Sequence, residues 1–380
     1  MKILKTAALL ISAAMLMTGC AQVNEDVDTG EEAVYISPSV PEVKGNYPLS
    51  LLNDKEKQFY DRMVEAVNAY EEHISIEGAD TTMAKKLFKL MYTQENRIFW
   101  VDSKYNFHED TGVIDVFYRY TPEESAEMRA VLDFKAAAVL ADMPQGASDY
   151  EKVTYLHDSI IKGCSFSKAG DHVNSAYGVI VDGVAQCEGY AFAMSYLCSS
   201  AGLENYVVTG TSAEGETHAW NKIFADGEWY NVDCTWDDPM LKRESKDYII
   251  HDYMLVSDSE IEGISHFTDI FFFEPLPCTD AENNYFIREG LYCTDATQAV
   301  AVFEDALKKA VAENRCDIEI RIDGKDVYSE VISAMFDNGG LKKIIEKLNS
   351  TSGARIASAV KSVNDELLTI HVSLIYEGDE

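Results

Sequence analysis

Positive charge is scarce in this chain of 380 residues, which has 32 lysines and arginines against 65 aspartates and glutamates. The formal net charge is therefore −33 at neutral pH. Binding to nucleic acid requires a surface that neutralises phosphates, so we expect no nucleic-acid partner. A charge of this size favours solubility and says little about mechanism.

Long apolar runs and paired metal-binding motifs are also lacking. The apolar run at residues 7–17 is short for a membrane span. No Cys-x-x-Cys and no His-Glu-x-x-His occurs. The spacing of cysteine and histidine therefore predicts no metal site, and we expect no cofactor.

The N-terminus has the pattern of an export signal. Lys2 and Lys5 precede the apolar run, and Thr18-Gly19-Cys20 follows it. A charged start, a short apolar centre and a small-residue end are typical of secretory signals. The end also resembles a bacterial lipoprotein signal, in which Cys20 is lipidated and becomes the first residue; an ordinary cleaved signal is the alternative. The resemblance implies an exported protein, held by this lipid alone to the outer face of the bacterial cell membrane.

Composition and pattern divide the chain into a signal, a tether and three folded regions. Apolar residues make up 47% of the sequence and aromatic residues 11%, enough for a substantial core. The segment that follows the signal is acidic and has little hydrophobic periodicity, as is typical of flexible tethers. The predicted divisions are a signal peptide at 1–19, a tether at 20–45, a mainly helical or mixed region at 46–147, a domain with the candidate chemistry at 148–295, and a small α/β unit at 296–380.

Two capping boxes mark helix starts. Thr121-Pro122-Glu123-Glu124 predicts a helix that runs to about Ala141. Ser148-Asp149-Tyr150-Glu151 opens a helix that carries His157-Asp158. A metal or proton-relay role for this pair is conceivable, but a packed histidine with a hydrogen bond is the favoured interpretation.

Residues 183–190 carry the first candidate for chemistry. A glycine-containing turn leads to Cys187, and apolar residues at helical spacing follow as far as Ala201. Cys187 therefore lies at a helix N-terminus, where free N–H groups and the helix dipole favour an anion such as the nucleophilic thiolate. A buried structural thiol is the alternative, and it is the expected state of Cys198 and Cys234.

A hairpin downstream supplies a base and a group to orient it. Residues 217–236 read as two strands joined by Asp226-Gly227, a preferred two-residue turn. The register that pairs the residues flanking this turn places His218 and Asp233 on one face as diagonal neighbours. The carboxylate can then orient the imidazole, and the imidazole can take the proton of the cysteine.

These motifs resemble the core of the transglutaminase-like superfamily. The resemblance covers roughly residues 150–258 and implies an α+β fold with a papain-like core. In that core a helix carrying the cysteine packs on an antiparallel sheet carrying the histidine and the aspartate. By the family's pattern Cys187, His218 and Asp233 are the catalytic triad. The matching stretches are Cys187-Glu188-Gly189-Tyr190, His218-Ala219-Trp220-Asn221 and residues 229–239.

The implied reaction is acyl transfer through a cysteine thioester. The thiolate attacks a carboxamide or peptide carbonyl, the histidine protonates the leaving amine, and water or an amine resolves the thioester. Water is the default acceptor at a cell surface, so we favour a cysteine peptidase or amidase acting on a peptide, protein or cell-wall peptide. A protein-glutamine cross-linking acyltransferase and a non-catalytic surface binding protein are the alternatives.

The substrate cleft is predicted to include Gln186, Tyr177, Trp220 and Trp236. The backbone N–H of Cys187 is one expected oxyanion donor, because Cys187 starts a helix. Papain-like peptidases place a glutamine six residues before the cysteine, where this chain has Val181. The sequence therefore identifies no second oxyanion donor.

Overall fold

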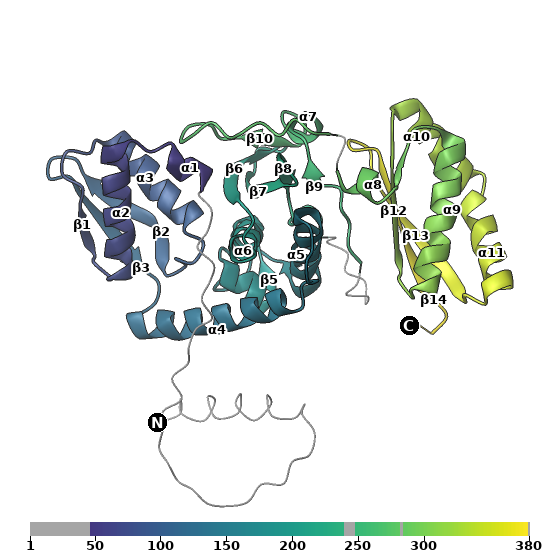
Figure 1. Cartoon of the computed structure of the whole chain (residues 1–380), viewed down its shortest axis with the longest axis horizontal. Helices are drawn as coiled ribbons and strands as arrows, with labels where there is room; N and C mark the ends of the chain where they lie inside the picture. The colour runs from purple at the N-terminus through teal and green to yellow at the C-terminus, as the bar shows by residue number, and fades with distance from the viewer. Residues whose placement is uncertain (1–45, 239–247, 282–283, 379–380) are drawn as a thin grey trace, which may run out of the picture. The chain divides into compact units, whose positions relative to one another are not determined.

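The computed structural model describes residues 46–238, 248–281 and 284–378 (Figure 1). Helices and mainly antiparallel sheets alternate along this part of the chain, so the fold is α+β as predicted. The predicted signal peptide, the tether and Cys20 lie outside the described residues. Within the described ranges, no helix is long and apolar enough to cross a membrane.

The first region combines helices with a small antiparallel sheet of order β1-β3-β2. Asn53 caps α2 with a capping box, and Asp80 caps α3. The elements are α1 (Tyr47–Ser50), α2 (Asp54–Asn68), β1 (His73–Ser75), α3 (Thr81–Gln94), β2 (Val101–His108) and β3 (Val113–Tyr118).

Both predicted capping boxes start helices. Thr121 caps α4 (Pro122–Ala141), and the side chain of Glu124 returns to the backbone N–H of Thr121. Ser148 caps α5 (Asp149–Gly163) in the same way. Each box satisfies N–H groups that lack a partner inside the helix, which is why the sequence alone locates these helix starts.

The central sheet has the strand order β10-β6-β7-β8-β9. Ala225 pairs with Glu228, which confirms the predicted register, and Asp226 and Gly227 have φ values of 50° and 101° as a two-residue turn requires. The second hairpin strand ends at Val232, four residues earlier than predicted. The strands are β6 (Asn205–Ser212), β7 (Thr217–Ala225), β8 (Glu228–Val232), β9 (Met254–Val256) and β10 (His266–Thr268).

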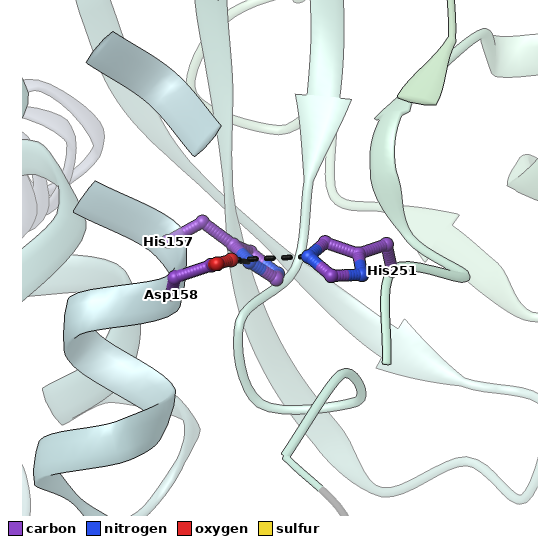
Figure 2. A group of neighbouring side chains, drawn as sticks. All are labelled: His157, Asp158 and His251. Carbon is purple, nitrogen blue, oxygen red and sulfur yellow. Dashed lines mark hydrogen bonds and ion pairs between the residues drawn. The ribbon is translucent and has the colours of Figure 1, made fainter. Parts of the chain in front are cut away.

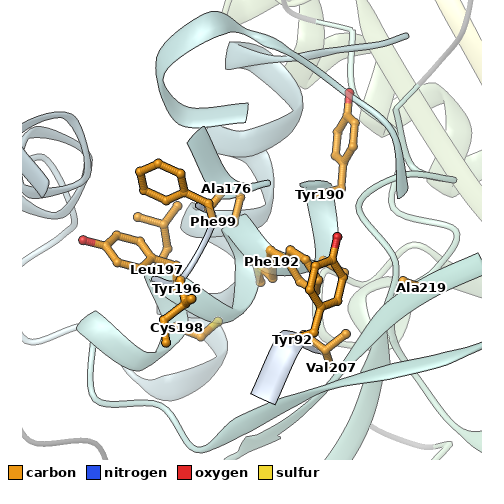
Figure 3. Packing of buried hydrophobic residues seen from close by; sticks show 14 of the residues in the cluster. Tyr92, Phe99, Ala176, Tyr190, Phe192, Tyr196, Leu197, Cys198, Val207 and Ala219 are labelled. Carbon is orange, nitrogen blue, oxygen red and sulfur yellow. The ribbon is translucent and has the colours of Figure 1, made fainter. Parts of the chain in front are cut away.

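Helix α6 (Cys187–Ser200) packs on β6 and β7 and is almost entirely buried. Figure 3 shows Phe192 of this helix beside Tyr92 of α3, with ring centroids 6.0 Å apart. Gly189 lets the helix approach its neighbours, because a Cβ there would lie 2.5 Å from the carbonyl oxygen of Val173. A π-helical turn (Gly178–Asp182) and the short parallel pair of β4 (Ser165–Phe166) and β5 (Val184–Ala185) precede it.

One hydrophobic cluster unites the first region with α6 and the central sheet, since it contains Met63, Trp100, Tyr190 and Val207. A second cluster, which includes Phe303 and Ile320, belongs to the C-terminal region. The predicted domain boundaries remain predictions.

The C-terminal region is an α/β arrangement around a sheet of order β11-β12-β14-β13. Short helices α7 (Asp258–Ile261) and α8 (Tyr285–Arg288) precede this sheet in the chain. Its elements are β11 (Tyr292–Cys293), α9 (Ala296–Ala312), β12 (Asp317–Ile322), α10 (Lys325–Ile332), a π-helical turn (Ser333–Asp337), α11 (Gly340–Ser352), β13 (Ile356–Asn364) and β14 (Thr369–Tyr376).

The second hydrophobic cluster yields a matched stability test. Phe303 is 0% exposed, whereas Phe134 on α4 is 59% exposed. Phe303→Ala is expected to lower the free energy of unfolding by about 3–5 kcal/mol, because it removes apolar contacts and leaves a cavity. Phe134→Ala should change it by less than about 0.5 kcal/mol. Urea unfolding measures both, and equal effects would contradict the packing described.

Candidate active site

Cys187 is the first residue of α6, as predicted, and it is half-buried. Its Sγ lies 4.0 Å from the carbonyl oxygen of Thr217 at the start of β7. The preceding Gln186 is held at its backbone, where the N–H donates to the oxygen of Val173 at 2.9 Å. Its side-chain amide donates to Oδ1 of Asn174. The thiol is therefore fixed at the positive end of a buried helix dipole.

His218 of β7 and Asp233, the residue after β8, are brought together by the hairpin. Nε2 of His218 lies 2.5 Å from Oδ2 of Asp233. The side chain of Cys187 also interacts with the His218 ring, where it favours the protonated imidazole. With Nε2 directed to the carboxylate, Nδ1 is the ring nitrogen left for the thiol. The structure thus brings all three predicted triad side chains into one site.

Asp233 is a buried carboxylate that accepts hydrogen bonds through both oxygens. Oδ1 accepts from the backbone N–H of Thr235 at 2.9 Å and of Trp236 at 3.3 Å. Oδ2 is shared by His218 and by His266 of β10, whose Nε2 is 3.0 Å away. Burial works to raise the pKa of Asp233, but the two histidines outweigh it and hold this pKa well below its usual range.

His266 is a site residue that sequence reasoning missed. It is completely buried, and Nδ1 of its ring lies 2.9 Å from Oγ of Ser265. The ring lies edge-on to Trp220 with centroids 4.8 Å apart. No motif or spacing connects residue 266 to the hairpin, because the two segments meet only when β10 joins the edge of β6.

The environment of His218 favours its protonated form. Burial works against the charge, but the adjacent carboxylate of Asp233 and its hydrogen bond prevail and raise the pKa of His218 to about 10. A histidine in this state can donate a proton to a leaving group near neutral pH.

A cleft of about 750 Å³ opens at the site. Gln186, Cys187, His218 and Trp236 line it, so two of the four predicted cleft residues are present. The Trp236 ring lies 5.2 Å from that of His218. Charged residues of both signs surround the opening: Lys89, Lys168, Glu188, Glu214, Glu216 and Asp269.

The other two predicted cleft residues lie elsewhere, among the described residues. Trp220 is 1% exposed, because its ring stacks behind His218 and its Nε1 donates to Oδ1 of Asn231 at 3.1 Å. Tyr177 packs against Phe99 and His172, with ring centroids 5.7 and 4.8 Å away. Neither side chain is part of the cleft wall described above.

The arrangement of a helix-start cysteine, a histidine and a buried aspartate defines the papain-like class of thiol site. Residues 138–234 match the model of the transglutaminase-like superfamily. This segment of the chain is therefore a transglutaminase-like core, which confirms the resemblance seen in the sequence.

Curated relatives match about a quarter of this chain. The mouse (Mus musculus) kyphoscoliosis peptidase is 27% identical over 96 residues, which are 22% of this chain and 14% of the relative. The human (Homo sapiens) kyphoscoliosis peptidase is 25% identical over 123 residues, which are 28% of this chain and 19% of the relative. This chain therefore spans less than a fifth of the length of either relative.

A crystal structure of a TGase is similar over 31% of this chain and 34% of its own, with 20% identity and a TM-score of 0.26. That overlap is too small to support a comparison of fold or function.

The charge on His218 predicts a pH dependence of stability. Its pKa in the folded protein is raised from 6.5 to about 10. Its contribution to the free energy of unfolding is therefore complete below about pH 6.5 and is lost as the pH rises through about 10. The difference in free energy of unfolding between wild type and His218→Gln is expected to shrink over this window, by on the order of a few kcal/mol. Urea unfolding at stepped pH measures it. In the Asp233→Asn background the decline should move to lower pH; a difference that is flat with pH would contradict the assignment.

Proposed function

We propose that this chain is a thiol enzyme that acts on peptide or carboxamide bonds by acyl transfer. The observation that carries the proposal is that the Cys187 thiol, at a helix start, and the His218 ring line one cleft, and that Asp233 lies 2.5 Å from that ring. A nucleophile, a base and a group that orients the base are the parts that covalent acyl transfer requires.

The chemistry follows from the charges. The Cys187 thiolate attacks the carbonyl carbon of the substrate, and the His218 imidazolium then gives its proton to the leaving amine. Asp233 holds the ring and stabilises its charge. Water, deprotonated by the neutral histidine, attacks the thioester and releases the acid, which restores the thiolate and the imidazolium.

The oxyanion of the tetrahedral intermediate needs hydrogen-bond donors. The backbone N–H of Cys187 is one, since first-turn N–H groups have no acceptor within their own helix. For the second donor we propose the side-chain amide of Asn174, which lines the same cleft and is oriented by its hydrogen bond from Gln186.

Hydrolysis of peptide bonds is the favoured outcome. The cleft is open and bears charges of both signs, which suits an extended peptide better than a small apolar molecule. The curated relatives that match part of this chain are named as peptidases, which supports the same choice. The proposed substrates are peptides, proteins or cell-wall peptides, reached from a position on the outer face of the cell membrane.

Thiol reactivity tests the site without a known substrate. Burial raises the pKa of the Cys198 and Cys234 thiols well above the ordinary value, so both should react slowly. Cys187 is expected to alkylate with iodoacetamide at least about 10-fold faster near neutral pH, and His218→Ala should slow it about 10-fold or more. Mass spectrometry of timed digests gives the rates. Equal, slow labelling of all three thiols would favour a binding protein over an enzyme.

Substrate capture separates hydrolysis from cross-linking. Peptide and cell-wall libraries would be incubated with wild type or Cys187→Ala, each with and without a primary amine. Products gained only with wild type and carrying a new carboxylate support hydrolysis. Incorporation of the amine in preference to water would instead assign a cross-linking acyltransferase, and identical products from both proteins would overturn the enzyme.

The proposed anchor has its own test. In a bacterial host, metabolic labelling with a fatty acid is expected to mark the wild-type chain and leave Cys20→Ser unmarked. The variant should also leave the membrane fraction, because a cleaved chain without lipid has no remaining anchor in this proposal. An unlabelled wild type would indicate an ordinary secretory signal.

A further inference from the structure

A second group of histidines and carboxylates lies outside the cleft. Figure 2 shows His157 and Asp158 of α5 facing His251, which precedes β9. Nδ1 of His157 is 3.2 Å and Nε2 of His251 is 3.0 Å from the same atom, Oδ1 of Asp158. The three donor atoms lie within 4.8 Å of one another. Two imidazole nitrogens and one carboxylate oxygen therefore converge on one point.

The outward-facing nitrogen of each ring is also bound to a carboxylate. Nε2 of His157 is 3.1 Å from Oδ2 of Asp237, and Nδ1 of His251 is 2.5 Å from Oε1 of Glu319 on β12. Histidines that bind metals almost always donate their second N–H to such a partner, which fixes the tautomer. Here Asp237 and Glu319 leave Nδ1 of His157 and Nε2 of His251 as the free lone pairs.

The two rings are buried and stacked, with centroids 5.2 Å apart. A neutral imidazole has one N–H and one lone pair. When its N–H donates to Asp237 or Glu319, its lone pair is directed at Asp158. A cation bound there would accept the lone pairs of both rings and one carboxylate oxygen.

We propose that His157, Asp158 and His251 bind a divalent first-row transition-metal ion. Two imidazoles and one carboxylate suit zinc, and a water molecule can complete the coordination because the Asp158 side chain is 25% exposed. Lys162 is 3.9 Å from Oδ2 of Asp158 and so lies at the other oxygen of this carboxylate.

The site would join three parts of the chain. Glu319 belongs to the C-terminal sheet, and His157 and Asp158 belong to the helix that packs on α6. Asp237 follows Asp233 by one turn, and its backbone N–H donates to the Asp233 carbonyl oxygen at 3.2 Å. A metal here would fix the C-terminal sheet to the segment that carries Asp233.

Metal analysis of the full chain tests the proposal. The protein is stripped with a chelator and dialysed, Zn²⁺ is added, and bound metal is measured by plasma mass spectrometry and by competition with a chromogenic chelator. We expect about one equivalent per chain and a higher Tm with Zn²⁺. His251→Gln and Asp158→Asn should each abolish stoichiometric binding. If neither of these variants folds, Glu319→Gln tests the same site, and it should weaken metal binding about 10- to 100-fold.

Two controls exclude other sites. His218, Asp233 and His266 also converge within 4.8 Å, so His266→Gln should keep the equivalent of metal. His73 and His108 flank the half-buried Asp115 on separate oxygens, at 2.8 and 2.7 Å. The double variant His73→Gln, His108→Gln should also keep the equivalent of metal. A folded wild type without bound metal or a Zn²⁺-dependent Tm shift would overturn the proposal, as would metal lost in His266→Gln and retained in His251→Gln.

Discussion

The fold of the site depends on a buried carboxylate that must be kept ionised. A charge removed from water is tolerated only when donors surround it, and Asp233 has two backbone N–H groups on one oxygen and two histidines on the other. The backbone donors close the turn after β8. His218 connects β7 to this carboxylate, and His266 connects β10 to it. One carboxylate thus determines where three segments of the chain meet.

The nucleophile is positioned by packing rather than by charge. α6 can lie close to its neighbours because Gly189 removes a side chain at the contact, and its buried residues fix the helix against β6 and β7. The aromatic contact between Phe192 and Tyr92 extends this support into the first region. A helix held in this way has little freedom to move its first residue, which is what precise placement of a sulfur beside an imidazole requires.

Several buried polar groups join the C-terminal sheet to the preceding part of the described chain. Besides the contact of Glu319 with His251, Arg321 lies 2.7 Å from Glu260, and His371 lies 2.9 Å from Asp252. Buried ion pairs cost solvation and contribute less to stability than apolar contact, but they demand one geometry. The proposed metal would act in the same sense, since coordination fixes both distance and angle.

The sequence by itself determined the features that depend on a few neighbouring residues. The capping boxes at Thr121 and Ser148, the Asp226-Gly227 turn and the helix start at Cys187 follow from local hydrogen bonding, and the hairpin register then placed His218 beside Asp233. Only the tertiary structure decided which distant groups would join them. His266 is 33 residues from Asp233, and His251 is 93 from Asp158, so no local periodicity connects them. Trp220 shows the same limit. Strand alternation correctly places it on the face of His218. Only the packing of other segments over that face decides that the Trp220 side chain is buried and not part of the cleft.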